Sequence, residues 1–166
     1  MCPDLIKVSN VSKGYKIKTS SSLFKPTFKK INALHDLSFN YNTAGNIGVL
    51  GRNGAGKTTL ARGLIQSQRP GEDVPSPTYT LVQTYDLPNY ELWHCDLYRL
   101  NHPDEVHEIG LLDAFEDAVC LVEWPDKLGE YFPKDALRID IAFKGEGRCL
   151  TMNTPWEDKL RTLKNV

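Results

Sequence analysis

Hydrophobic residues in this chain of 166 residues occur in short runs separated by polar breaks. Residues 5–8 and 15–17 predict two short strands with turn-forming breaks between them. Residues 37–41 alternate between apolar and polar side chains, which is typical of a strand with one buried face. Residues 47–50 are apolar without alternation, and this pattern predicts a strand covered on both faces in the middle of a sheet.

The next segments predict helices that alternate with short apolar strands. Residues 58–67 predict a helix, which Arg69-Pro70-Gly71 ends. The runs 92–95 and 119–122 predict two more strands, each followed at once by an acid, Asp96 or Glu123. Between these runs, Pro103 opens a helical stretch whose apolar residues recur at a spacing of three and which Gly110 interrupts: Val106, Ile109, Leu112 and Phe115.

The last part of the chain predicts a short helix, a hairpin and a final helix. Pro125 starts the short helix, and residues 137–143 and 149–152 flank a glycine-containing hairpin turn at 144–147. The capping box at 154–157, with proline at its first helical position, predicts the C-terminal helix. Strands and helices in this order predict a single α/β domain over 1–166, with a mainly parallel sheet flanked by helices and antiparallel strands added at the N- and C-terminal ends.

Composition favours a soluble cytoplasmic protein whose cysteines are reduced. Hydrophobic residues make up 40% of the chain and charged residues 25%, which suits a packed core. No apolar run is long enough to cross a bilayer, and there is no signal-peptide pattern, so we expect no membrane association. The cysteines have no CxxC spacing, so the sequence suggests neither a zinc site nor a disulfide framework.

The net charge of −1 hides a strong asymmetry between the two parts of the chain. Residues 1–69 contain 11 Lys/Arg and 2 Asp/Glu, whereas residues 70–166 contain 9 Lys/Arg and 19 Asp/Glu. Such a seam indicates a dipolar surface, a polyanionic ligand or two segments of different origin. The basic segment 18–30 is interpreted as a mobile, solvated loop rather than a nucleic-acid arm, so we expect no strong direct binding of nucleic acid.

Residues 51–58 match the phosphate-loop pattern GxxxxGK[ST] in full, between a predicted strand and a predicted helix. Glycines in such a loop let the backbone N–H groups turn toward phosphates, and the following helix adds the positive end of its dipole. Lys57 is expected to contact the β- and γ-phosphates, and the Thr58 hydroxyl to ligate Mg²⁺. The motif therefore predicts binding of a nucleoside triphosphate.

Two acids are candidates for the magnesium-binding and water-orienting groups that phosphoryl transfer needs. Asp96 and Glu123 each end an apolar strand, and ligands of such sheets bind at the carboxyl ends of the strands. From the sequence alone, each acid could also cap a helix or form a salt bridge. His94 is interpreted as a strand residue, and Arg99 could meet either a phosphate or a surface acid.

From Gly51 to the end, the chain resembles TsaE, the small bacterial ATPase of threonylcarbamoyladenosine synthesis on tRNA. Four stretches match in order: 54–64, 76–82, 96–100 and 121–129. The resemblance implies Mg-dependent ATP binding and weak ATP hydrolysis, with the TsaD–TsaB pair as partner. An alternative is a chimeric module that binds ADP or ATP with little turnover.

The resemblance implies a role for each matching residue. Asp96 would be the magnesium-side acid and Glu123 the second acid required for hydrolysis, with Lys57 on the phosphates; the division of work between the two acids stays open. Thr80 would act as a switch near the γ-phosphate, in a loop with Ser76 and Thr78. The expected nucleotide-binding residues are Tyr15, Asn53, Gly54, Ala55, Gly56, Lys57, Thr58, Thr59, Thr80 and Trp124, and the expected metal ligands are Thr58, Asp96 and Glu123.

The front of the chain, residues 1–50, resembles instead the start of an ATP-binding cassette transporter ATPase. The likeness lies in 8–15, 33–39 and 47–56, and it implies that Tyr15 stacks on adenine, although a tyrosine at this position could also pack within a strand. The transporter's Leu-Ser-Gly-Gly-Gln signature is missing. Because the two resemblances meet at the shared Gly-Ala-Gly-Lys of the phosphate loop, the sequence suggests a chimera, natural or engineered, of a segment 1–50 and a segment 51–166.

Overall fold

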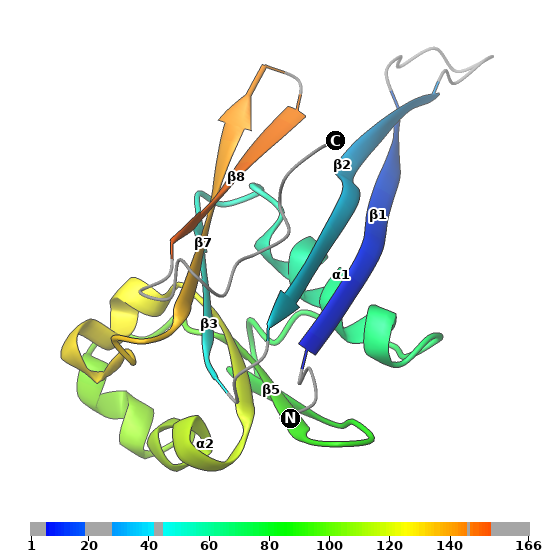
Figure 1. Ribbon diagram of the computed structural model, residues 1–166. Coiled ribbons are helices and arrows are strands. Elements are labelled where there is room, and N and C mark those ends of the chain that lie inside the picture. The colour runs from blue at the N-terminus through cyan, green and yellow to red at the C-terminus, as the bar shows by residue number, and fades with distance from the viewer. Residues whose placement is uncertain (1–5, 19–27, 42–44, 146, 154–166) are drawn as a thin grey trace.

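The computed structural model describes residues 6–18, 28–41, 45–145 and 147–153, and the side chains from residue 45 onward within these ranges. Within the described chain, six strands form one mixed sheet in the order β4-β5-β6-β3-β7-β8 (Figure 1). These strands are β3 (Ile47–Gly51), β4 (Val82–Asp86), β5 (Glu91–Asp96), β6 (Val119–Glu123), β7 (Leu137–Lys144) and β8 (Gly147–Asn153). Parallel pairing joins β5, β6, β3 and β7, while β4 and β8 are antiparallel edge strands. This arrangement confirms the predicted α/β class.

The position of β3 explains its uniformly apolar sequence. β3 lies between β6 and β7, and Ile47 and Val49 are buried. β6, whose residues 119–122 were predicted to form a strand, is buried along its whole length. Because β3 and β6 run parallel with Val49 opposite Glu123, their carboxyl ends meet at the same edge of the sheet. The predicted hairpin is confirmed as β7 and β8.

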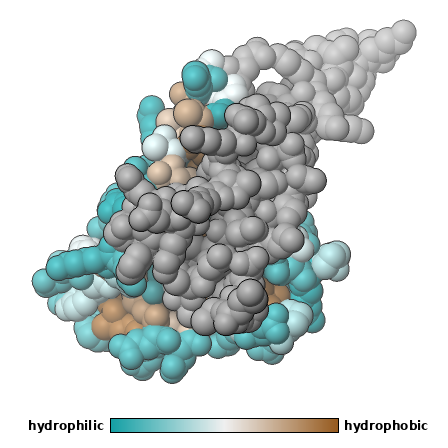
Figure 2. All heavy atoms as spheres, in the orientation of Figure 1, coloured by the Kyte–Doolittle hydropathy of each residue, from teal (hydrophilic) through white to brown (hydrophobic). Residues whose placement is uncertain are grey.

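Helices cover both faces of the sheet, and the sheet separates two clusters of buried hydrophobic side chains. Helix α1 (Lys57–Gln68) packs Leu60 and Ile65 against one face. The other face is covered by the 3₁₀ helix η1 (Pro103–His107), helix α2 (Leu111–Asp117) and the 3₁₀ helix η2 (Pro125–Tyr131). All four were predicted, including the interruption at Gly110, which has a left-handed conformation before α2. The described surface visible in Figure 2 is mainly hydrophilic, with smaller hydrophobic patches.

The N-terminal strands differ in part from their prediction. Residues 6–18 form one strand, β1 (Ile6–Lys18), whose pairing with β2 (Phe28–Tyr41) is irregular near Val11 and Gly14, where two separate strands were expected. The two strands are antiparallel, as expected, but they pair with each other in a sheet of their own beside α1 (Figure 1). The antiparallel strand at the far edge of the main sheet is β4, which was not predicted.

Two predicted segments fall partly or wholly outside the described residues. The basic loop expected at 18–30 is narrower, because β1 continues to Lys18 and β2 begins at Phe28; residues 19–27 are not described. The helix expected after residue 154 also lies outside the described ranges. In the part of the chain that is described, no helix has the length and apolar character needed to span a membrane.

Candidate functional site

The phosphate loop connects the end of β3 to the start of α1, as its motif predicted. Gly56 precedes the helix with φ of 109°, and Gly54 has φ of 75°, so both need the conformational freedom of glycine. Gly51 has φ of 147°, and a Cβ there would come within 2.7 Å of the Ile141 carbonyl oxygen. The chain therefore approaches β7 closely at the point where the loop begins.

Lys57 is buried inside the loop, with 6% of its surface exposed. Its Nζ donates hydrogen bonds to the carbonyl oxygens of Gly51, at 2.9 Å, and Arg52, at 3.2 Å, and lies 4.1 Å from the centre of the Trp124 ring. Burial lowers the pKa of Lys57, and the carboxylates of Glu123 and Asp96 oppose this change. An anion beside Nζ would offset the cost of burying this cation.

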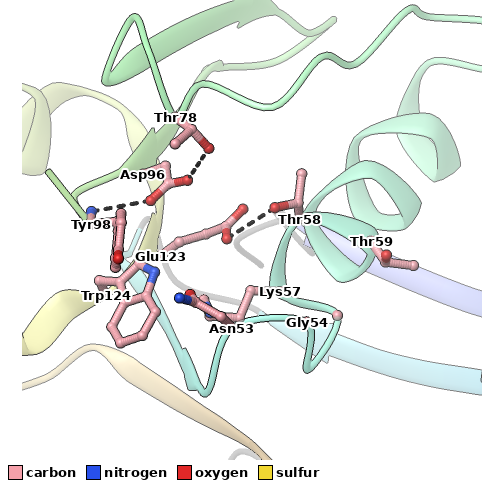
Figure 3. Close-up of a pocket in the computed structure, with 11 residues that line it drawn as sticks. Asn53, Gly54, Lys57, Thr58, Thr59, Thr78, Asp96, Tyr98, Glu123 and Trp124 are labelled. Carbon is pink, nitrogen blue, oxygen red and sulfur yellow. Dashed lines mark hydrogen bonds between the residues drawn. The ribbon is translucent and has the colours of Figure 1, made fainter.

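Glu123, at the end of β6, joins the loop to the sheet. Its carboxylate is 2% exposed and accepts a hydrogen bond from Thr58 Oγ1 at 3.1 Å (Figure 3). The other carboxylate oxygen lies 3.0 Å from Nε2 of His94, which is fully buried in β5. His94 is a strand residue, as predicted, and it also orients Glu123, which its sequence context did not indicate.

Asp96 lies beside Glu123, because these two residues are register partners at the ends of β5 and β6. One of its oxygens accepts a 2.6 Å hydrogen bond from Thr78 Oγ1, which in turn lies 2.8 Å from Ser76 Oγ. The other oxygen accepts a hydrogen bond from the backbone N–H of Tyr98 at 3.1 Å. Asp96 is thus fixed toward the loop before β4, and Glu123 toward α1.

These groups surround a cavity of about 360 Å³. Its polar side is the phosphate loop with the two acids, and its apolar side is formed by Trp124 and Tyr98, whose ring centres lie 5.4 Å apart. Trp124 has a left-handed conformation, with φ of 62°, which is uncommon for a residue other than glycine. The residues lining the cavity are Asn53, Gly54, Gly56, Lys57, Thr58, Thr59, Thr78, Asp96, Tyr98, Glu123 and Trp124.

The structure brings most of the predicted site residues to this cavity, with two exceptions among the described side chains. Thr80, expected near the γ-phosphate, is exposed and is not among the lining residues, whereas Thr78 of the same loop lines the cavity and contacts Asp96. Ala55 is buried just behind the lining. Tyr15 lies in β1 opposite Ile31, and its side chain is outside the described part. Tyr98 was not predicted, although an aromatic directly after the Asp96 strand was a usable signal.

The donor set suits a magnesium ion bound together with a nucleotide. Mg²⁺ prefers oxygen ligands and usually takes only one or two from the protein, with phosphate and water completing its shell. Thr58 and Glu123 offer such oxygens side by side, 3.1 Å apart. No group of three or more His, Cys, Asp or Glu that could hold a metal occurs among the described residues, so a fully protein-made metal cage is not present there.

Comparisons with known proteins agree with this geometry. A family model described as "Threonylcarbamoyl adenosine biosynthesis protein TsaE" matches residues 17–150. A TsaE of Haemophilus influenzae is 40% identical over 100 residues; the match spans 60% of this chain and 63% of that protein, less than two thirds of its length. A TsaE of Borreliella burgdorferi is 36% identical, over 78% of this chain and 96% of its own.

A solved structure, Bacillus subtilis YdiB, superposes with a TM-score of 0.52 at 28% identity, covering 66% of this chain and 68% of its own. Its similarity and the phosphate loop identify the fold as that of a P-loop NTPase. The family model covers well over half of the chain, including the phosphate loop and both acids. The chain therefore belongs to the TsaE family of threonylcarbamoyl adenosine biosynthesis proteins.

Proposed function

We propose that this chain binds ATP or ADP with Mg²⁺ and hydrolyses ATP slowly. The observation that supports this most directly is the hydrogen bond between Thr58, at the end of a complete phosphate loop, and Glu123, at the end of the neighbouring strand. A hydroxyl and a carboxylate side by side at this place would hold one magnesium ion, which would supply positive charge for the phosphates. Lys57 supplies the positive charge for the β- and γ-phosphates.

The contacts favour a division of work between the acids that differs from the one implied by the resemblance. Glu123 contacts the proposed magnesium ligand Thr58, so we assign it to the magnesium side. Asp96 contacts Thr78 instead, so we assign these two residues to the γ-phosphate side, where Asp96 orients the attacking water. Lys57 Nζ donates to two loop carbonyl oxygens, and the phosphate oxygens of a bound nucleotide would replace those acceptors.

The adenine base is assigned to the apolar side of the cavity. Trp124 and Tyr98 form a tilted aromatic pair there, and stacking on an aromatic ring contributes about 1–3 kcal/mol per base. The stacking of Tyr15 on adenine remains a prediction from the sequence. Exchanging Trp124 for leucine should therefore weaken ADP binding more than binding of inorganic pyrophosphate.

The family match supports a role in threonylcarbamoyladenosine synthesis on tRNA. The TsaD–TsaB pair, which the sequence resemblance implies, is the proposed partner. This role would place the chain in the cytoplasm. A transporter-like front segment and a chimeric origin remain predictions from the sequence. The family model already begins at residue 17, so much of the segment 1–50 lies within the TsaE match.

The proposal is tested by comparing Glu123→Gln with the wild type, using calorimetric titration of Mg·ATP and release of phosphate. We expect Glu123→Gln to keep ATP affinity within about fivefold and to lose about 100-fold in turnover, because the carboxylate charge acts mainly in the transition state. Asp126→Asn removes an exposed acid three positions away and should change neither. Absence of ATP binding by the wild type would refute the proposal, and binding without phosphate release would leave only a nucleotide-binding module.

A further inference from the structure

Arg148, in β8, contacts the phosphate loop from outside the cavity. Its Nε donates a 3.1 Å hydrogen bond to the carbonyl oxygen of Ala55, and its Nη2 donates a 3.3 Å hydrogen bond to that of Gly54. The guanidinium also lies 4.0 Å from the centre of the Phe143 ring in β7. Figure 1 shows the β7–β8 hairpin extending past the end of β3, where the loop begins.

The two hydrogen bonds orient consecutive peptide groups of the loop. A trans peptide is planar, with its C=O and N–H on opposite sides, so fixing the carbonyl also fixes the direction of the N–H. The Ala55 carbonyl belongs to the peptide whose N–H is carried by Gly56, and Gly56 lines the cavity. Holding the Ala55 carbonyl toward Arg148 therefore directs the Gly56 N–H away from the hairpin.

Glycine makes this control necessary. Gly54 and Gly56 flank Ala55, and both have positive φ, so the backbone on either side has little intrinsic preference for one conformation. The guanidinium is a planar fork that can hold two acceptors at once, whereas an ammonium group has no such fixed geometry. Phe143 restricts the orientation of the fork by stacking on it.

We propose that Arg148 is a positioning residue that holds the phosphate loop in the shape that binds nucleotide. This inference rests on the proposed nucleotide binding and adds a residue from the β7–β8 hairpin to it. Arg148 acts through the loop backbone and so affects ATP and ADP alike. A loop without it must be ordered when the nucleotide binds, and this cost appears as weaker affinity.

The experiment measures the Kd of Mg·ATP and Mg·ADP by calorimetry, together with the thermal unfolding midpoint, for the full chain and three variants. Arg148→Gln removes the charge and the fork, and Arg148→Lys keeps the charge alone. Lys144→Gln, an exposed residue of the same hairpin, removes an equal charge away from the loop. Losing the charge-assisted bonds should raise both Kd values about tenfold in Arg148→Gln.

We expect Arg148→Lys to weaken binding several-fold and Lys144→Gln to bind like the wild type. Equal affinity of Arg148→Gln and wild type would overturn the inference, as would a drop in unfolding midpoint without a change in Kd. Wild-type affinity in Arg148→Lys together with weakened binding in Lys144→Gln would also overturn it, because charge alone would then explain the effect. If the wild type itself binds no nucleotide, the proposed function fails rather than the role of Arg148.

Discussion

His94 and Glu123 form a buried pair whose coupling can be measured. His94 is fully buried, Glu123 is 2% exposed, and their polar atoms are 3.0 Å apart. Replacing His94 by leucine removes one of the hydrogen-bond partners of a carboxylate that is almost fully buried. Replacing Glu123 by leucine leaves both nitrogens of the buried imidazole without a hydrogen-bond partner, because its Nδ1 already has none in the described part of the chain.

The magnitudes follow from these contacts. A lost hydrogen bond to a buried charged group costs about 2–3 kcal/mol, so His94→Leu should destabilise the fold by that amount. Glu123→Leu should cost about 2 kcal/mol, about 1 for the buried imidazole that loses its partner and about 1 for the Thr58 hydroxyl that loses its acceptor. Two leucines together form an apolar contact, and only the Thr58 hydroxyl then loses its acceptor, for about 1 kcal/mol. The coupling energy should therefore be about 3 kcal/mol.

The assay is equilibrium unfolding in urea for the wild type, both single variants and the double variant, with no nucleotide present. We expect the double variant to be more stable than at least one of the single variants. Each kcal/mol lost from the free energy of unfolding should also lower the thermal midpoint by about 2–4 °C for a chain of this size. Single effects that add within about 0.5 kcal/mol would refute the reasoning, because independent sites are additive to that precision.

Two further predictions concern a glycine and the cysteines. Gly51→Ala should lower the free energy of unfolding by about 3 kcal/mol, as measured by thermal unfolding, since its φ is positive and a carbonyl of β7 lies 2.7 Å from the new Cβ. The control Gly145→Ala, at a position with positive φ but open space, should cost only about 1–2 kcal/mol. Equal costs for the two variants would contradict the close approach at Gly51. At pH 8 iodoacetamide should modify Cys149 faster than Cys95 or Cys120, as peptide mass mapping can verify. Burial raises the pKa of both Cys95 and Cys120, that of Cys120 to about 12, which keeps their reactive thiolates scarce.

The sequence predicted the elements whose signals are local. The strand 47–50, the loop 51–58 and the following helix each have a pattern within a few neighbouring residues, and all three are present. Asp96 and Glu123 were found because each ends an apolar strand, and parallel pairing then brings them side by side. The helices at Pro103 and Pro125 were visible from proline at their first turn.

Features that depend on contacts between distant segments were missed. β4 is short and mixed in polarity, and its pairing with β5 was not apparent from its own residues. Thr78 and Thr80 are equivalent in sequence pattern, and only the turn before β4 decides which one reaches Asp96. Arg148 contacts Gly54 across 94 positions, and no local pattern marks such a contact.

The most direct test of the account is the rate of phosphate release from Mg·ATP by the purified chain as the TsaD–TsaB pair is titrated in, with Glu123→Gln measured in parallel. The account predicts a slow rate for the chain alone, an increase that saturates with the partner pair, and no increase for Glu123→Gln. A wild-type rate that stays at the level of Glu123→Gln at every partner concentration would contradict it.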